Sequence, residues 1–459
     1  MSVVPGGIDN IFGLPDLPTR QSSAQPVVHA IVHVIRRPSK LAMRQLYELL
    51  CECHAKTIVD VVLDRLCAES SDHVCAIAAV ARRLIQEAPD VEPVKVGVAL
   101  LGMFGTTEDS ALISTVGLYE EITAYSVFAF EHLLREKAEP KIWSLAKAVY
   151  GWGRINAVQC LADTTAPEIK EWMLREGFRN HILDEYLAYT CATSGGLKQA
   201  LADSVIDSDL LAASVDLLRA LIKGGPADNI TDYADGPAVC LSFLRHMRSR
   251  PVRTVNAVEC VLDIRSLMDG DGWAGLQDQP GWTPKVRLQV RSLVNEVLEQ
   301  MDARRVVGDG LRSKDRVDFF LAANLASHFG IDAWPLRLER QRRGSGEEWH
   351  FLMQTDRRDR IEQVLDLARA QLDFDVIGSG PTMSMGLGQE FKDDTALAMV
   401  IRGLNRFPGA GWDMLRMGLR GRVCGVRNAT IEVLGEWERE AWSSDVLEEL
   451  RGGRRARTR

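Results

Sequence analysis

Apolar residues recur at steps of three and four positions along most of the chain, which is the spacing of one buried face of an α-helix. Residues 40–69 show the pattern clearly, and similar segments follow along the chain. Most of them end at glycine, proline or a cluster of Ser, Thr and Asp, as helices do. The nearest candidate for a strand is the isolated segment EEWHFLMQ at 347–354. The pattern therefore predicts an all-α protein.

The segment GWGRINAVQCLADTTAPEIKEWMLREG at 151–177 shows the local unit. Ile155 and the apolar residues that follow it form the stripe of a first helix. Thr165 and Glu168 have the spacing of a capping box at the start of a second helix. Gly177 is a natural left-handed terminator for that helix. Two short helices joined by a few residues predict a helical hairpin.

This unit recurs. RINAVQCL at 154–161 is echoed by TVNAVECV at 254–261 and by VRNATIEVL at 426–434. The shared small alanine would let helices approach closely, and the shared asparagine would hydrogen-bond to a neighbouring turn. Echoes separated by several hairpin lengths are typical of a repeat array. We expect an α-solenoid of stacked antiparallel helical hairpins, in which each hairpin buries its apolar face against its neighbours.

Interruptions of the helical rhythm divide the chain, which at 459 residues is too long for one compact core. Five segments are predicted: a flexible N-terminal lead-in, an N-terminal helical array, a joint rich in loops, a C-terminal helical array, and a disordered tail rich in arginine. They span residues 1–26, 27–266, 267–303, 304–450 and 451–459.

Three motifs resemble a group of uncharacterised bacterial HEAT-like helical-repeat proteins. They are GPTMSMGLGQEF at 380–391, RFPGAGW at 406–412 and VRNATIEVLGEW at 426–437. The resemblance implies a HEAT-like solenoid. Some members of the group carry the label limonene hydroxylase, which implies an oxidoreductase acting on a monoterpene. Such an enzyme would need haem, flavin or non-haem iron to activate oxygen.

The residues themselves predict no cofactor, no metal ion and no catalytic residue. Cys424 in LRGRVCGVRN lacks the glycine register and the aromatic residue of a haem-thiolate loop. GSGPTMSMGLG lacks the spacing of a dinucleotide-binding turn. His29 and His33 share a helix face, but no glutamate stands between them as in a zinc protease. No serine nucleophile elbow is present.

Charge and hydropathy bear on whether the chain binds nucleic acid or spans a membrane. The chain carries 55 basic and 63 acidic side chains, and five of the arginines lie in the final RGGRRARTR. The rest of the chain is therefore acidic, which disfavours nucleic-acid binding, because such binding needs a continuous basic surface. No run of apolar residues is long enough to span a membrane, and the N-terminus lacks the pattern of a secretory signal. We expect a cytoplasmic protein with reduced cysteines.

Aromatic and basic residues beside the echoes are the candidate binding residues, because equivalent helices of a curved array line one concave face. These candidates are Trp152, Arg154, Trp412 and Arg427. The preferred hypothesis is a non-catalytic scaffold that binds a protein or peptide on that face. Two alternatives stay open: a limonene hydroxylase with a small-molecule substrate, and nucleic-acid binding through the basic tail and a groove.

Overall fold

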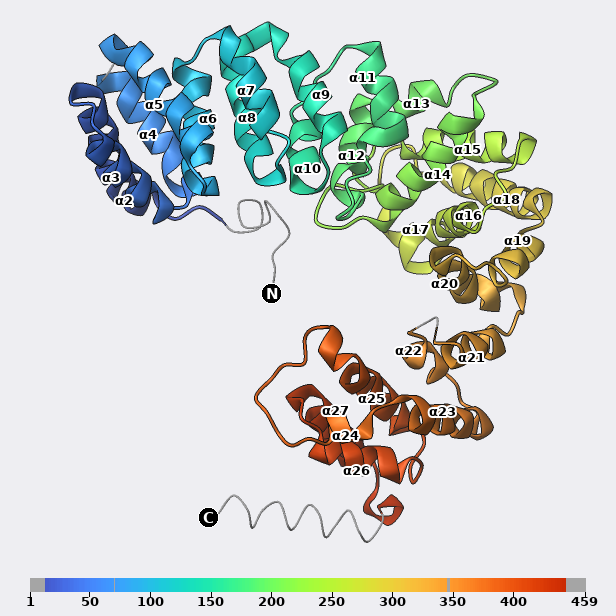
Figure 1. Ribbon diagram of the computed structural model, residues 1–459. Helices are drawn as coiled ribbons and strands as arrows, with labels where there is room; N and C mark the ends of the chain where they lie inside the picture. The colour runs from blue at the N-terminus through green and yellow to red at the C-terminus, as the bar shows by residue number, and fades with distance from the viewer. Residues whose placement is uncertain (1–12, 70, 345–346, 443–459) are drawn as a thin grey trace. The chain divides into compact units, whose positions relative to one another are not determined.

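A computed structural model describes residues 13–69, 71–344 and 347–442 (Figure 1). Every regular element in these ranges is helical, so the all-α prediction is confirmed. None of the described helices is both long and apolar enough to cross a lipid bilayer. The chain divides into two compact units, residues 1–303 and 304–459. The second unit begins at the residue where the C-terminal array is predicted to begin.

The first unit contains helices of uneven length. They are α2 (Leu17–Arg36), α3 (Lys40–Cys51), α4 (Ala55–Glu69), α5 (Val74–Glu87), α6 (Val91–Phe104), α7 (Ser110–Val116), α8 (Glu120–Leu134), α9 (Glu139–Ala148), α10 (Gly151–Gln159), α11 (Pro167–Trp172), α12 (Glu185–Ser194), α13 (Leu197–Ala200), α14 (Ser208–Lys223), α15 (Gly236–Ser249), α16 (Val255–Leu267), α17 (Gly270–Leu276) and α18 (Pro284–Met301).

The even-numbered helices of this unit form a continuous row. From α2 to α16, each one contacts the next even-numbered helix, and α16 contacts α18. Several odd-numbered helices pack on the row: α3 contacts α2 and α6, α5 contacts α6, α9 contacts α10, and α15 contacts α18. Most helices therefore bury their apolar faces against close neighbours in the sequence.

The second unit has its own apolar core, to which Trp349, Leu397, Ile401 and Leu415 contribute. Its helices are α19 (Ala303–Gly310), α20 (Arg316–Leu325), α21 (Trp334–Arg342), α22 (Trp349–Leu352), α23 (Arg358–Gln371), α24 (Phe374–Ile377), α25 (Lys392–Gly403), α26 (Trp412–Arg420) and α27 (Cys424–Glu436). Within this unit α25 packs on α26 and α27, and α22 packs on α25. The strand candidate at 347–354 contains α22 instead of a strand.

Small residues set the closest approaches between helices. A Cβ atom on Gly102 of α6 would lie 2.6 Å from the Cα atom of Ala129 on α8. The shared alanine of the three echoes is fully buried in every case, as Ala157, Ala257 and Ala429. This burial agrees with the expectation that the alanine allows close packing.

The shared asparagine behaves less uniformly. Asn256 on α16 hydrogen-bonds to Asp216 on α14, and Asp216 also pairs with Arg179 at 2.6 Å. This contact links neighbouring hairpins, although it reaches a helix side chain instead of a turn. Asn428 is exposed and makes no side-chain hydrogen bond with any described residue.

The N-terminal boundary is corrected, because α2 begins at Leu17 and residues 17–26 are helical instead of forming a flexible lead-in. The Asp16 side chain caps the helix by accepting from the Thr19 amide at 3.1 Å. Ala24 is fully buried, so the apolar stripe of the helix begins before Pro26. Apolar burial therefore outweighs the local preference of the proline and serine residues. Residues 1–12 and 443–459, which include the predicted tail, lie outside the described residues.

The joint predicted at 267–303 is also corrected, because α17 and α18 fill most of it. The Thr283 side chain caps α18 by accepting from the Val286 amide at 3.3 Å. Val290 and Val297 on α18 are fully buried. Glycine, aspartate and proline are concentrated before this cap, and their density in the sequence hides the short helix α17.

The predicted capping box at Thr165 does not form. The helix α11 begins at Pro167 with Ala166 as its cap residue and no side-chain cap. The hydroxyl of Thr164, one position earlier, accepts from the Ala166 amide at 3.2 Å. Pro167 starts the helix instead, because its φ is already fixed near the helical value and its missing amide needs no partner at the first helical position.

Helices α14 and α16 are also joined by a charged cluster. Arg219 on α14 pairs with Glu259 and lies 3.9 Å from Asp263, both on α16. Burial is the main cause that raises the pKa of Asp263 to about 6; the nearby Glu259 carboxylate adds to the shift, and Arg219 opposes it. Ionised Asp263 therefore costs stability at neutral pH.

The close contact between α6 and α8 yields a prediction. We expect Gly102→Ala to lower the free energy of unfolding by about 2 kcal/mol, because backbone atoms of Ala129 cannot yield to the added methyl group. Gly275→Ala on α17 is the control, since no atom lies within 4 Å of the position that its methyl group would take. That change should be neutral or slightly stabilising. Equal effects in urea denaturation would contradict the packing argument.

Asp263 yields a second prediction. Its pKa in the folded chain lies above the ordinary value of 3.8, so its protonation stabilises the fold as the pH falls from 7 through 6 towards 4. We expect Asp263→Asn to stabilise the protein by about 1 kcal/mol at pH 7, a figure reduced for solvent exposure of the side chain. The difference from the wild type should vanish near pH 4. Urea denaturation across this pH range is the measurement, and a difference that grows at low pH would refute the assignment.

Candidate functional site

Two glycines bring the start of α10 against α8. A Cβ atom on Gly153 would lie 2.6 Å from the hydroxyl oxygen of Thr123, and one on Gly151 would collide with the Glu120 carboxylate. Gly151 also has a φ of 59°, which glycine adopts without strain. The two glycines are therefore required by the close approach of these helices.

Trp152, between these glycines, contacts α12. Its ring lies 5.0 Å from the ring of Tyr186, measured between centroids, and is tilted by 58°. Both side chains line a pocket of about 640 Å³ formed by α10, α12 and the loop after α14. The complete lining is Trp152, Ile155, Gln159, Tyr186, Tyr189, Thr190, Pro226, Ala227 and Asp228.

Five polar side chains at this pocket have no hydrogen-bonding partner in the part of the chain that the structure describes. They belong to Gln159, Tyr186, Tyr189, Thr190 and Asp228. None of them forms a side-chain hydrogen bond or ion pair with any residue in the described ranges. The pocket therefore combines aromatic surface with hydroxyl, amide and carboxylate groups that are available to a ligand.

The turn between α11 and α12 fixes the tyrosines relative to Trp152. Asn180 is fully buried, and its side-chain oxygen accepts from the amides of Ile182 at 2.9 Å and Leu183 at 3.0 Å. Its backbone carbonyl accepts from the Gly151 amide at 2.8 Å. One asparagine thus joins the start of α10 to the turn that precedes α12.

The third wall of the pocket is a short loop anchored at both ends. Gly224 ends α14 with a φ of 62°. The Ile230 amide donates to the Leu221 carbonyl at 2.9 Å, and Ile230 is buried. Between these points the loop carries Asp228 on the exposed side of the pocket.

The structure places Arg154 inside the fold, with 4% of its surface exposed. Its guanidinium donates to the carbonyls of Ala146 at 3.0 Å and Val149 at 2.9 Å, at the end of α9. It also donates to the Arg179 carbonyl at 2.7 Å. Burial lowers the pKa of Arg154, and the nearby Tyr150 and Glu176 oppose this shift. The residue predicted to bind a partner here joins backbone segments at the hairpin turn.

Arg427 makes analogous contacts in the second unit. Its guanidinium donates to the carbonyls of Gly421 at 2.7 Å and Arg422 at 2.9 Å, just beyond the end of α26. It also donates to the Thr382 carbonyl at 3.1 Å. Trp412, at the start of α26, is half-buried and packs edge-on against Trp437, with the ring centroids 5.3 Å apart.

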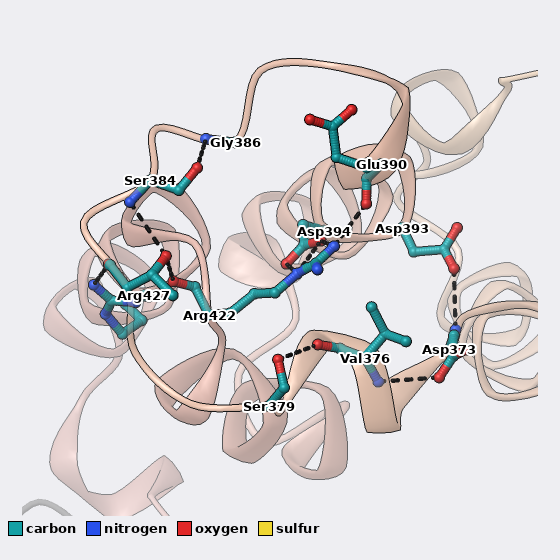
Figure 2. A network of polar contacts seen from close by, with 11 residues as sticks. Asp373, Val376, Ser379, Ser384, Gly386, Glu390, Asp393, Asp394, Arg422 and Arg427 are labelled. Carbon is teal, nitrogen blue, oxygen red and sulfur yellow. Dashed lines mark hydrogen bonds and ion pairs between the residues drawn. The ribbon is translucent and has the colours of Figure 1, made fainter.

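Arg427 and Arg422 together hold the loop that leads into α25. Figure 2 shows Arg422 directed at Asp394 and at the Glu390 carbonyl, with distances of 2.9 Å and 2.6 Å. The carboxylate of Asp394 is almost fully buried. The hydrogen bond and ion pair with Asp394 raise the pKa of Arg422. The GPTMSMGLGQEF motif is therefore a loop held in place by hydrogen bonds from Arg422 and Arg427.

The four predicted residues thus fall into two separate groups. Trp152 and Arg154 lie on α10 of the first unit, and Trp412 and Arg427 lie on α26 and α27 of the second. Of the four, Trp152 lines the large pocket. Among the described residues, no group of three or more His, Cys, Asp or Glu side chains is placed to hold a metal ion.

Sequence reasoning missed the other walls of the pocket. Tyr186 and Tyr189 are three positions apart, a spacing that places both on one helix face. That spacing in EYLAYT was an available signal. No local sequence pattern marked Asp228 as a pocket residue, because its position depends on how the loop after α14 folds back towards α10.

Comparison with known proteins identifies no relative. No family model matches the chain, and no curated protein matches it. One solved structure, titled as an engineered protein, aligns over 90% of this chain and 98% of its own, with 16% identity and a TM-score of 0.24. So low a score carries no argument about fold or function.

The buried guanidinium yields a prediction. We expect Arg154→Met to lower the free energy of unfolding of the first unit by about 3 kcal/mol, because several buried carbonyls lose their donor. Arg154→Lys should lower the free energy of unfolding by less, since lysine retains a charged donor but lacks the planar guanidinium with its several N–H groups. Arg245→Ala is the control, because that arginine is exposed and its side chain has no partner among the described residues. Equal urea midpoints for the methionine and control variants would contradict this role.

Proposed function

We propose that the protein is a HEAT-like α-solenoid without catalytic activity, and that its even-numbered helices line a concave face that binds a protein or peptide partner. The row of contacts between successive even-numbered helices supports this arrangement. The recurrence of a buried alanine in the three echoes supports it as well. In solenoids, equivalent helices of successive repeats line one binding surface.

The pocket of Trp152, Tyr186 and Tyr189 is the proposed centre of this surface. The observation that carries the proposal is the set of five polar side chains in a pocket with an aromatic wall, whose polar groups make no hydrogen bond or ion pair within the described chain. Tyrosine and tryptophan provide large contact areas at low entropic cost and are enriched at binding hot spots. Free hydroxyl and amide groups can pair with a peptide backbone.

The charge of the pocket indicates the chemistry of the partner. Asp228 is its only charged lining residue. Residues 1–303 carry 39 acidic and 29 basic side chains, so the surrounding unit is acidic as well. A guanidinium or ammonium group would be attracted both to the aromatic faces and to Asp228. We therefore propose that the partner is a peptide segment containing arginine or lysine.

Short fluorescent Gly/Ser peptides with a central Arg-Arg, Lys-Lys or Glu-Glu pair test this proposal. We expect binding of the two basic peptides by fluorescence anisotropy, and no binding of the acidic one. Asp228→Asn should weaken binding of the Arg-Arg peptide by about threefold to tenfold, and Tyr189→Ala by about tenfold or more.

Asp203→Asn is the matched control, because Asp203 is an exposed acidic residue of the same unit outside the pocket. It should bind as the wild type does. Equal affinity for the Arg-Arg and Glu-Glu peptides would refute the proposed specificity. Unchanged binding in both Asp228→Asn and Tyr189→Ala would refute the proposed location.

Capture of a small molecule is the second candidate function. A volume of about 640 Å³ lies within the range of pockets that hold small ligands. Limonene is the probe that the sequence resemblance suggests. Quenching of tryptophan fluorescence by limonene in the wild type, but not in Tyr186→Ala, would favour this candidate over the peptide.

A further inference from the structure

A second pocket opens on the same row of helices, formed by α4, α6 and α8. Its volume is about 340 Å³. Most of its wall is apolar and includes Val59, Leu63, Ala99, Tyr125 and Phe128. Exposed apolar concavities of this kind are favourable sites for burying apolar side chains.

The start of α2 lies at the edge of this pocket. Arg20, in the first turn of α2, donates to the Thr57 carbonyl of α4 at 3.4 Å. The same guanidinium pairs with Asp60, and Asp60 is one of the residues that line the pocket. The chain that leads into α2 therefore reaches the fold directly beside this pocket.

The sequence before α2 is rich in apolar side chains. Residues 1–12, MSVVPGGIDNIF, contain Ile8, Ile11 and Phe12 and a single charged side chain, Asp9. They lie outside the described residues. Twelve residues can extend over about 40 Å, enough to reach from the start of α2 across three neighbouring helices.

We propose that residues 1–12 bind in the pocket of α4, α6 and α8 of the same chain, with Ile8, Ile11 and Phe12 as the buried side chains. Two observations select this occupant over a separate partner. The anchor at Arg20 places the segment next to the pocket, and tethering gives it a high effective concentration there. Its apolar side chains also match the apolar wall. The inference is independent of the peptide proposed for the pocket at Trp152.

Site-specific photocrosslinking tests the proposal in the full-length protein. Phe12 is replaced by p-benzoylphenylalanine, and the crosslinked peptides are mapped by mass spectrometry. We expect crosslinks within one chain to residues 56–63, 99 or 124–128. Crosslinks that map elsewhere, or that join two chains in a dilution series, would overturn the proposal.

A variant that fills the pocket provides the next step. Ala124→Trp adds an indole to the half-exposed wall of α8. It should abolish most of the crosslinking from position 12. Ala111→Trp on the exposed side of α7 is the matched control and should retain the crosslinks. Circular dichroism establishes whether each variant remains folded, and undiminished crosslinking in folded Ala124→Trp would overturn the assignment.

Hydrogen exchange gives a readout that needs no substitution in the pocket. Deletion of residues 1–12 should accelerate exchange in α4 and α8 by about tenfold and leave α14 and α16 unchanged. Addition of a synthetic peptide of residues 1–12 should restore the protection. Unchanged exchange in α4 and α8 after the deletion would also overturn the proposal.

Discussion

The first unit depends on how closely α10 approaches α8. Gly151 and Gly153 have no side chains to separate the two helices, so the start of α10 lies against Glu120 and Thr123. This contact fixes the rotation of α10, and the rotation in turn places Trp152 against α12. A side chain at either glycine would move the indole together with the helix that carries it. The aromatic wall of the large pocket is therefore set by two residues that do not line it.

Arginines that bind backbone carbonyls give the hairpin turns a second constraint. Arg154 donates to carbonyls at the end of α9, and Arg427 donates to carbonyls just beyond the end of α26. In both cases an arginine in the second helix of a hairpin satisfies backbone groups at the end of the first. The carbonyls at the end of α9 lie at the negative end of that helix's dipole, which favours the positive charge of Arg154 there. The arginines selected from the sequence as binding residues thus have a clear role within the fold.

Periodicity predicted the helices well, because the period of burial is a local property of the sequence. Predicted boundaries were wrong where two signals opposed each other, as at Leu17, where a cap and a buried stripe outweighed nearby proline and serine. The site was predictable only in part. Trp152 was predicted because it is an aromatic residue beside one of the echoes, whereas Asp228 reaches the pocket through a loop fold that depends on the Ile230–Leu221 hydrogen bond. Such tertiary placement leaves no local pattern in one sequence.

The pocket at Trp152 and the pocket of α4, α6 and α8 share a physical origin. Helices pack closely where one of them carries glycine or alanine, and small side chains at the face of the row also leave that face hollow. Gly102 brings α6 against Ala129 of α8, while Ala99 and Ala124 on the same helices line the smaller pocket. Gly151 and Gly153 likewise bring α10 against α8 beside the larger pocket, the one at Trp152. Larger neighbours, Phe128 in one pocket and Tyr186 in the other, then form the walls. Surfaces suited to binding can therefore arise from the packing that holds the row together, before any residue is selected for a partner.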